Sequence, residues 1–234
     1  MRRSLTRRGR RSLLASFLTI TLCLPFAAGA QHEELGSVLD SFISEHGINE
    51  GNFALGFRSV GGDEYLYNAD KLFDTASLYK IPLNMYYYEL EASGALAATD
   101  KVGGVSLADC HRLSLVKSDN ELSEKMVQRI GGFRALKLKA LEYCGMSESD
   151  VGAGFFDTTG FTARMMLGIL EYLYNGGDVF AGQLELMKTA QEGEYLRSGS
   201  CGLEIAQKYG AQVYNGLMNF CVAGIVYADE PFSW

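Results

Sequence analysis

Strand-like segments at both ends of the chain, with a long helical region between them, constrain the fold more than any other feature. Residues 53–60 (FALGFRSV) and 64–69 (EYLYNA) flank a Gly-Gly-Asp turn and predict an antiparallel hairpin. Residues 203–210 (LEIAQKYG) and 219–228 (NFCVAGIVYA) predict a second strand pair. Between the pairs, apolar residues recur at helical spacing. The pattern predicts an α+β fold, with one antiparallel sheet built from both chain ends and an inserted all-helical lobe.

A helix and the absence of linkers complete this outline. Residues 33–47 carry apolar side chains on one helical face, which predicts an amphipathic helix before the first strand pair. The sequence contains no repeat and no low-complexity linker, and 234 residues can bury one substantial core. We therefore expect a single domain over residues 31–234. Its sheet lobe would comprise about 31–76 and 194–234, and its helical lobe about 77–193.

The first thirty residues have the composition of an export signal. Six arginines and no acidic residue precede an almost wholly apolar segment, which ends at the small residues Ala28-Gly29-Ala30. We expect cleavage before Gln31 and a location in the periplasm, at the cell surface or outside the cell. A Sec signal is favoured over a twin-arginine signal. The alternative is an uncleaved anchor, although the apolar segment is shorter than the ~20 residues that a membrane span requires.

Charge and cysteine content narrow the choice of partners. Loss of six of the 21 Lys and Arg residues would leave 15 against 28 Asp and Glu, a net charge of about −13. Such a surface disfavours nucleic acid and anionic membranes. The four remaining cysteines lie in no Cys-x-x-Cys motif, so no metal site is expected. Buried thiols and one disulfide both remain open for these residues: Cys110, Cys144, Cys201 and Cys221.

Ser77 and Lys80, in DTASLYKIP, form the first candidate pair for chemistry. At the start of a helix, their i, i+3 spacing would place both side chains on one face, about 5–6 Å apart at Cβ. Burial among apolar neighbours would lower the pKa of the lysine, which could then accept the proton of the serine. A Ser-x-x-Lys occurs roughly once by chance in a chain of this length. Pro82 favours a helix that begins near Tyr79, with Ser77 on a tight turn before it.

Two further segments, 118–120 (SDN) and 208–210 (KYG), carry groups suited to binding or catalysis. In the first segment, Ser118 or Asn120 would simply cap a helix that starts at Glu121. Alternatively, the hydroxyl of Ser118 and the carboxamide of Asn120 would face a cleft, where one relays a proton and the other binds a substrate amide. The second lies on a predicted strand, where a lysine usually faces solvent but a glycine lets a ligand approach the backbone. Three histidines lie near no motif serine and are expected at the surface or as caps: His32, His46 and His111.

Taken in order, the three motifs resemble those of class A β-lactamases and penicillin-binding proteins. The stretches YNADKLFDTASLYKIP, DTTGFTARMM and VAGIVY resemble the same family, and the likeness runs from about Phe53 to Phe232. The chain is therefore similar to a β-lactamase-like or D,D-peptidase-like serine hydrolase. The resemblance implies an acyl-enzyme formed with a β-lactam or a D-Ala-D-Ala-like amide and then hydrolysed. It implies no cofactor. Its partner would be a small-molecule β-lactam or a peptidoglycan stem peptide, and we expect a monomer.

The resemblance also implies a role for each motif residue. Ser77 would be the nucleophile, Lys80 its proton acceptor, and Ser118 the group that passes the proton to the leaving nitrogen. The backbone N–H groups of Ser77 and Ala211 would form the oxyanion hole. Lys208 would also lower the pKa of Lys80. The residues implied in substrate binding are Asn120, Lys208, Tyr209 and Gly210.

Three departures from the family pattern keep alternatives open. Tyr209 replaces a threonine whose hydroxyl commonly helps to bind the substrate carboxylate. The segment after Cys144 lacks the Glu-x-x-Leu-Asn setting of a deacylating glutamate, and its acids Glu148 and Asp150 are expected in solvent. The C-terminal strand and helix of the family are expected to be missing. The alternatives are a D,D-peptidase-like or penicillin-binding protein with slow deacylation, and a truncated, non-catalytic binder.

Overall fold

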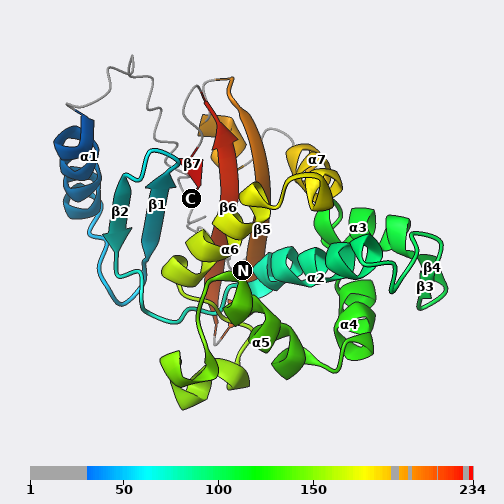
Figure 1. Cartoon of the computed structure of the whole chain (residues 1–234). Helices are drawn as coiled ribbons and strands as arrows, with labels where there is room; N and C mark the ends of the chain where they lie inside the picture. Colours follow the sequence, from blue (N-terminus) through cyan, green and yellow to red (C-terminus); the bar gives the residue numbers. More distant parts are fainter. Residues whose placement is uncertain (1–30, 191–194, 200–201, 215, 229–231, 234) are drawn as a thin grey trace, which may run out of the picture.

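A computed structural model describes residues 31–190, 195–199, 202–214, 216–228 and 232–233 of the chain (Figure 1). The export signal predicted for residues 1–30 lies outside these residues, and so does Cys201. Among the described residues, no helix is both long enough and apolar enough to cross a membrane.

Strands from both ends of the chain form one five-stranded antiparallel sheet, in the order β2-β1-β7-β6-β5 (Figure 1). The predicted hairpin consists of β1 (Leu55–Ser59) and β2 (Glu64–Tyr67). The second pair consists of β5 (Glu204–Tyr214) and β6 (Leu217–Tyr227), which pair along their whole length. The prediction of one sheet built from both chain ends is confirmed. β5 continues beyond its predicted end at residue 210, because β6 offers backbone partners as far as the turn.

Two short strand elements were not expected from the sequence. β7 (Phe232–Ser233) lies between β1 and β6, where the C-terminal strand was expected to be missing; Phe232 pairs with both Ser59 and Val226. β3 (Lys101–Val102) and β4 (Val105–Ser106) form a separate small hairpin. Its two turn glycines have φ of +58° and +88°, as a tight hairpin turn requires. Two-residue strands depend on backbone pairing with distant segments, which side-chain periodicity does not reveal.

Seven α-helices are described. The predicted first helix is α1, which lies beside β2 (Figure 1), and the other six follow β2 in the chain. Their bounds are α1 (Gln31–Glu45), α2 (Lys80–Ala92), α3 (Leu107–Leu115), α4 (Asn120–Arg129), α5 (Phe133–Tyr143), α6 (Ala163–Asn175) and α7 (Ala181–Thr189). Five 3₁₀ turns connect them: η1 (Ala76–Tyr79), η2 (Glu148–Asp150), η3 (Ala153–Asp157), η4 (Gly177–Val179) and η5 (Tyr195–Gly199).

The central helix of the core is α2, whose apolar residues are buried on every side. Ile81, Leu83, Met85 and Tyr87 have no exposed surface, as expected for a helix surrounded by protein. α6 covers the sheet (Figure 1), and Gly56 of β1 lies so close to Leu167 that a Cβ atom would come within 2.8 Å of its side chain. The start of α2 thus meets β5 and β6 through η1, and the candidate motifs gather at this junction.

Candidate active site

Ser77 lies on the 3₁₀ turn η1, directly before α2 begins at Lys80. This confirms the interpretation that the serine occupies a tight turn ahead of the helix. Pro82 lies in the first turn of α2, where its missing N–H would have no helical partner in any case. Ala76 has φ +45°, a left-handed conformation that alanine rarely adopts. The backbone before Ser77 is therefore held in a strained shape by its surroundings.

Gly210 lets strand β5 approach this turn closely. A Cβ atom at position 210 would lie 2.4 Å from the carbonyl oxygen of Thr75 and 2.9 Å from the backbone nitrogen of Ser77. No side chain larger than hydrogen fits there without a shift of the backbone. The glycine of the KYG segment thus brings the backbone of β5 beside the N–H of Ser77.

Lys80 is fully buried and contacts three residues of the candidate motifs. Its Nζ lies 3.1 Å from Oγ of Ser77 and 3.2 Å from Oγ of Ser118. It also donates at 2.7 Å to both the carbonyl oxygen of Ser118 and Oδ1 of Asn120. The structure therefore brings the first two motifs into direct contact.

The SDN segment differs from its predicted capping geometry. Asp119, and neither Ser118 nor Asn120, caps α4: its Oδ1 accepts from the N–H of Leu122 at 2.8 Å. The helix begins at Asn120, one residue earlier than predicted. Ser118 has φ +56°, which directs its hydroxyl toward the buried lysines rather than the helix. A carboxylate is as good a cap as a hydroxyl or carboxamide, so the sequence did not distinguish these residues.

Lys208 completes the cluster from β5. Its fully buried Nζ donates to Oγ of Ser118 at 3.0 Å and to the carbonyl oxygen of Tyr209 at 2.7 Å. It lies 4.2 Å from the centre of the Tyr209 ring, which stacks on Tyr195 at 4.8 Å. Ser118 thus lies between two lysines, and an aromatic ring covers one of them.

Burial weakens the basicity of both lysines. It lowers the pKa of Lys80 to about 8, and Asp119 and Glu124 partly oppose this change. Burial also lowers the pKa of Lys208 to about 7, and repulsion from Lys80 adds to the effect. Lys208 was expected to lower the pKa of Lys80, but it is not among the causes of that change, which are burial and the opposing acids. The repulsion is instead seen at Lys208, and burial is the main cause for both residues.

Two acidic residues of the segment between α5 and α6 are engaged at the surface. Glu148 forms an ion pair with Arg134, and Asp150 caps η2 by accepting from Ser147. Within the described part of the chain, neither carboxylate contacts Ser77, Lys80 or Ser118. The expectation that both lie in solvent agrees with this placement.

Sequence reasoning missed a buried lysine beneath this segment. Lys137 donates to the carbonyl oxygens of Phe155 and Gly160, the latter at 2.9 Å, and lies over the Phe155 ring. Burial lowers the pKa of Lys137 to about 8. A signal was present: Lys137 lies four residues from both Phe133 and Leu141, on the apolar face of α5.

A buried polar network behind α2 was also missed. Asn84 donates to the carbonyl oxygen of Lys80 at 2.6 Å and to Oγ of Ser114 at 3.0 Å. Its Oδ1 accepts from His111 at 2.8 Å, and His111 stacks on Tyr88 at 3.9 Å. The prediction that His111 lies at the surface is therefore wrong, because an imidazole with such partners is readily buried. Cys110, Cys144 and Cys221 are free thiols.

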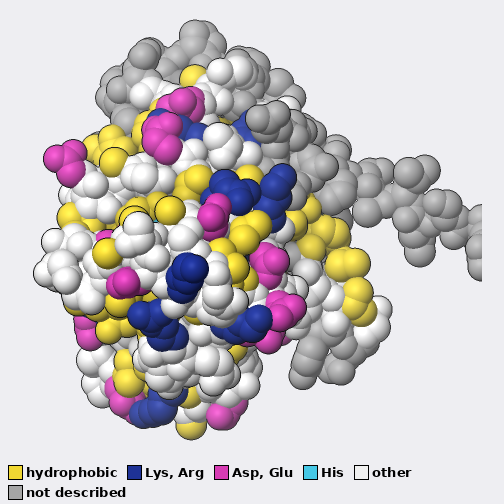
Figure 2. Space-filling model, turned by 90° about the vertical axis from the view of Figure 1, so that its right-hand side faces the viewer, with side chains coloured by type: hydrophobic (Ala, Val, Ile, Leu, Met, Phe, Trp, Pro, Cys, Tyr) yellow, Lys and Arg dark blue, Asp and Glu magenta, His cyan; other side chains and the backbone are white. Residues whose placement is uncertain are grey.

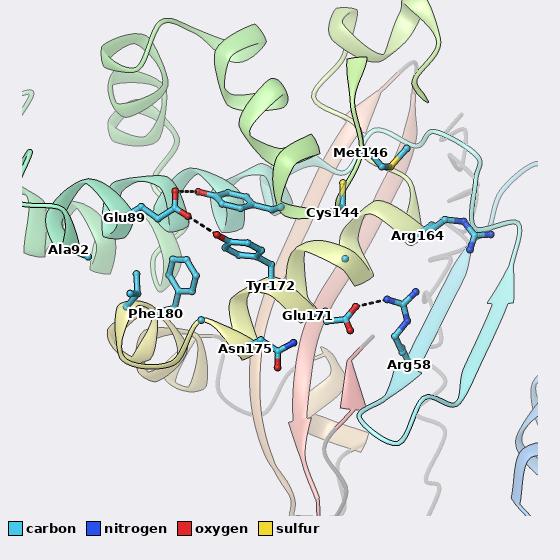
Figure 3. Close-up of a pocket in the computed structure, with 14 residues that line it drawn as sticks. Arg58, Glu89, Ala92, Cys144, Met146, Arg164, Glu171, Tyr172, Asn175 and Phe180 are labelled. Atoms are coloured by element: carbon cyan, nitrogen blue, oxygen red, sulfur yellow. Dashed lines mark hydrogen bonds and ion pairs between the residues drawn. The ribbon is translucent and has the colours of Figure 1, made fainter. Parts of the chain in front are cut away.

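A separate cavity of about 770 Å³ lies between α2, α5, α6 and β1 (Figure 3). Its charged residues have partners: Glu89 accepts from Tyr143 and Tyr172, Glu171 binds Arg58, and Arg164 binds Asp70, which lies outside the lining. None of the candidate site residues lines it. The chemistry indicated by the motifs therefore lies elsewhere, at the junction of η1, α4 and β5.

On the face shown in Figure 2, basic side chains lie among acidic and apolar ones and form no continuous basic surface. Among the described residues, no group of three or more His, Cys, Asp and Glu side chains is arranged to hold a metal ion.

Comparisons with known proteins agree with the observed fold. The profile of the Beta-lactamase enzyme family matches residues 35–233. A search of the curated proteins found no match. A beta-lactamase from Chitinophaga pinensis shares 16% identity, with a TM-score of 0.69 over 83% of this chain and 87% of that chain. An ancestral class A beta-lactamase (GNCA) shares 16% identity, with a TM-score of 0.69 over 85% and 88% of the two chains. PBP-A shares 17% identity, with a TM-score of 0.61 over 77% and 78%. At these identities, the structural likeness establishes the fold.

Proposed function

The chain belongs to the Beta-lactamase enzyme family, and we propose that it is an exported serine hydrolase that forms an acyl-enzyme at Ser77. Its substrate would be a β-lactam or a D-Ala-D-Ala-like amide, and residues 31–234 would be its catalytic domain. Family membership suggests a serine hydrolase of the β-lactamase type. The observation that carries the finer proposal is the convergence of Ser77, Lys80, Ser118 and Lys208 within hydrogen-bonding distance.

Lys80 would act as the base that takes the proton of Ser77. A neutral amine has two N–H donors and one lone pair. The carbonyl oxygen of Ser118 and Oδ1 of Asn120 can only accept, and at 2.7 Å they occupy both donors. The lone pair is then left for a hydroxyl, and Oγ of Ser77 lies 3.1 Å away. Burial lowers the pKa of Lys80 to about 8, so part of it is neutral near pH 7.

Ser118 would return the proton to the leaving nitrogen. Its hydroxyl lies 3.2 Å from Lys80 and 3.0 Å from Lys208, so it can receive a proton from one side while the other lysine stabilises its oxygen. The bond from Ser77 Oγ to the substrate carbonyl carbon forms as the amide C–N bond breaks. The nitrogen then leaves with the proton that Ser118 supplies.

The oxyanion that develops in this step would bind to the N–H groups of Ser77 and Ala211. Gly210 brings β5 within van der Waals distance of the backbone nitrogen of Ser77, which places the two donors on adjoining segments. The N-terminal end of α2 adds a favourable dipole. Asn120, Lys208, Tyr209 and Gly210 would bind the remainder of the substrate.

A long-lived acyl-enzyme is the second candidate outcome, as in a D,D-peptidase-like or penicillin-binding protein. The engagement of Glu148 with Arg134 and of Asp150 with Ser147 favours it. Hydrolysis of an acyl-serine needs a base that activates water, and these two acids are occupied at the surface. A non-catalytic binder would instead leave Ser77 unmodified.

Labelling with a fluorescent penicillin tests the proposal. The mature chain should acquire a covalent label that Ser77→Ala removes. Turnover of a chromogenic cephalosporin then separates the two outcomes: fast multiple turnover indicates a β-lactamase, whereas a single burst indicates slow deacylation. Absence of both a Ser77-dependent label and Ser77-dependent turnover would refute the acyl-enzyme and favour the binder.

A further inference from the structure

The carboxylate of Asp74 is bound by its own turn and by two segments that are distant in sequence. Its Oδ1 accepts from the backbone N–H of Ala76 at 3.1 Å and from Oγ1 of Thr159 at 2.9 Å. Its Oδ2 accepts from Nε2 of Gln212 at 2.7 Å. All three groups are donors, which suits an ionised carboxylate because it can only accept. Such charge-assisted bonds are stronger than bonds between neutral groups.

Two of these contacts flank the proposed oxyanion hole. Ala76 immediately precedes Ser77, and Gln212 immediately follows Ala211. Asp74 therefore ties together the two segments whose N–H groups would bind the oxyanion. The bond from Ala76 also accounts for its left-handed φ of +45°, because it holds the turn in a shape that alanine seldom adopts.

The third contact anchors the carboxylate to the segment between α5 and α6. Thr159 precedes Gly160, whose carbonyl oxygen accepts from the buried Lys137 at 2.9 Å. The hydroxyl of Thr75 also donates to the carbonyl oxygen of Thr159, at 3.3 Å. Asp74 is thus tied through Thr159 to the segment that holds the buried Lys137, and Thr75, beside Asp74, is tied to the same segment.

We propose that Asp74 is a positioning residue, which with its partner Gln212 sets the spacing between the N–H groups of Ser77 and Ala211. The inference rests on the proposed function, since it concerns the geometry of the same acyl-transfer site. Asp74 touches neither the nucleophile nor Lys80 in the described structure, so it acts through the backbone. A displacement of about 1 Å in such a site typically slows reaction by about 100-fold.

The decisive variant is Gln212→Glu, which places a second carboxylate against Asp74. Repulsion between the two groups should separate β5 from η1 and slow acylation of Ser77 by a fluorescent penicillin by about 10-fold to 100-fold. Non-covalent affinity before acylation should stay within a few-fold, because the binding side chains are untouched. Gln128→Glu, the same change at an exposed position of α4, controls for the added charge.

Recovery of the acylation rate in a double variant tests whether Asp74 and Gln212 act as a pair. Asp74→Asn alone should acylate within a few-fold of wild type, because the Gln212 amide can reverse and accept from the new amide group. Asp74→Asn combined with Gln212→Glu should recover most of the lost rate, since one side chain again donates to the other. Thermal unfolding of wild type and the four variants, followed by circular dichroism, shows whether each variant is folded.

The outcomes separate this inference from the proposed function. If wild type shows neither a label at Ser77 nor Ser77-dependent turnover, the proposed function fails and the inference falls with it. If wild type is labelled and folded Gln212→Glu acylates at the same rate, the inference alone is wrong. It is also wrong if the double variant stays as slow as Gln212→Glu, because the defect would then not arise from the pair.

Discussion

The ammonium nitrogen of Lys80 lies 3.1 Å from the hydroxyl oxygen of Ser77, on a side chain that has no exposed surface. A buried lysine is costly to keep charged, so its position beside a serine supports the proposal that the neutral amine accepts the proton of Ser77.

Replacement of Lys80 by methionine should remove the proton acceptor while filling the same buried volume. Acylation of Ser77 by a fluorescent penicillin should fall by about 100-fold to 10,000-fold, the usual contribution of a general base. Lys101→Met, at an exposed position of β3, should acylate like wild type. Equal labelling rates for wild type and Lys80→Met would show that another group accepts the proton.

Acylation should become faster as pH rises. Burial lowers the pKa of Lys80 to about 8, and the proposed base is its neutral form, so the rate should increase through about pH 8 and then level off. The substrate should be an uncharged ester, because Lys208, whose pKa burial lowers to about 7, also changes its charge in this range. Lys80→Arg, which stays charged, should show no such rise. A wild-type rate that falls with pH would contradict the assignment.

Tyr209 should limit the use of Lys208 by substrates that carry a carboxylate. The ring centre lies 4.2 Å from Nζ of Lys208, and this lysine has no exposed surface. In Tyr209→Thr, the ratio of the acylation rate with a penicillin to the acylation rate with an uncharged ester should therefore rise about 10-fold over wild type. Tyr209→Phe keeps the ring and should behave like wild type. If Tyr209→Phe instead loses activity, the hydroxyl and not the ring determines the preference.

Gly210→Ala should disturb the contact between β5 and η1. The added Cβ would meet the carbonyl oxygen of Thr75 at 2.4 Å, so the variant should lose about 1–3 kcal/mol of unfolding free energy and much of its acylation rate. Gly154→Ala is the matched control, since a Cβ at that position meets nothing within 4 Å. Urea unfolding and penicillin labelling measure the two effects. Normal stability and labelling of Gly210→Ala would rule out the close approach.

Local patterns in the sequence were sufficient to predict the sheet, the helical region and the position of Ser77 on a turn before α2. Each of these depends on the spacing of apolar residues or on the conformational limits of Pro82. Both are properties of residues close together in the sequence. The three motifs could be ordered along the chain, but only the fold shows that Ser118 lies between Lys80 and Lys208.

The features that were missed depend on distant partners. Asp74 gives no local signal, because its partners Thr159 and Gln212 are far along the chain. His111 was predicted at the surface because its partner Asn84 lies on another helix, and such a contact leaves no local sequence signal. Strand β7 exists only through its pairing with β1 and β6. Contacts of this kind follow from tertiary structure and not from propensity.

Intact-protein mass spectrometry after incubation with benzylpenicillin tests the central claim most directly. In samples quenched with acid during the reaction, wild type should gain the mass of one penicillin, and peptide mapping should locate it on Ser77. The matched variant Ser77→Ala should gain no mass under the same conditions. A wild type that neither gains this mass nor turns over benzylpenicillin, or an adduct that persists in folded Ser77→Ala, would contradict the proposal that Ser77 is the acylated nucleophile.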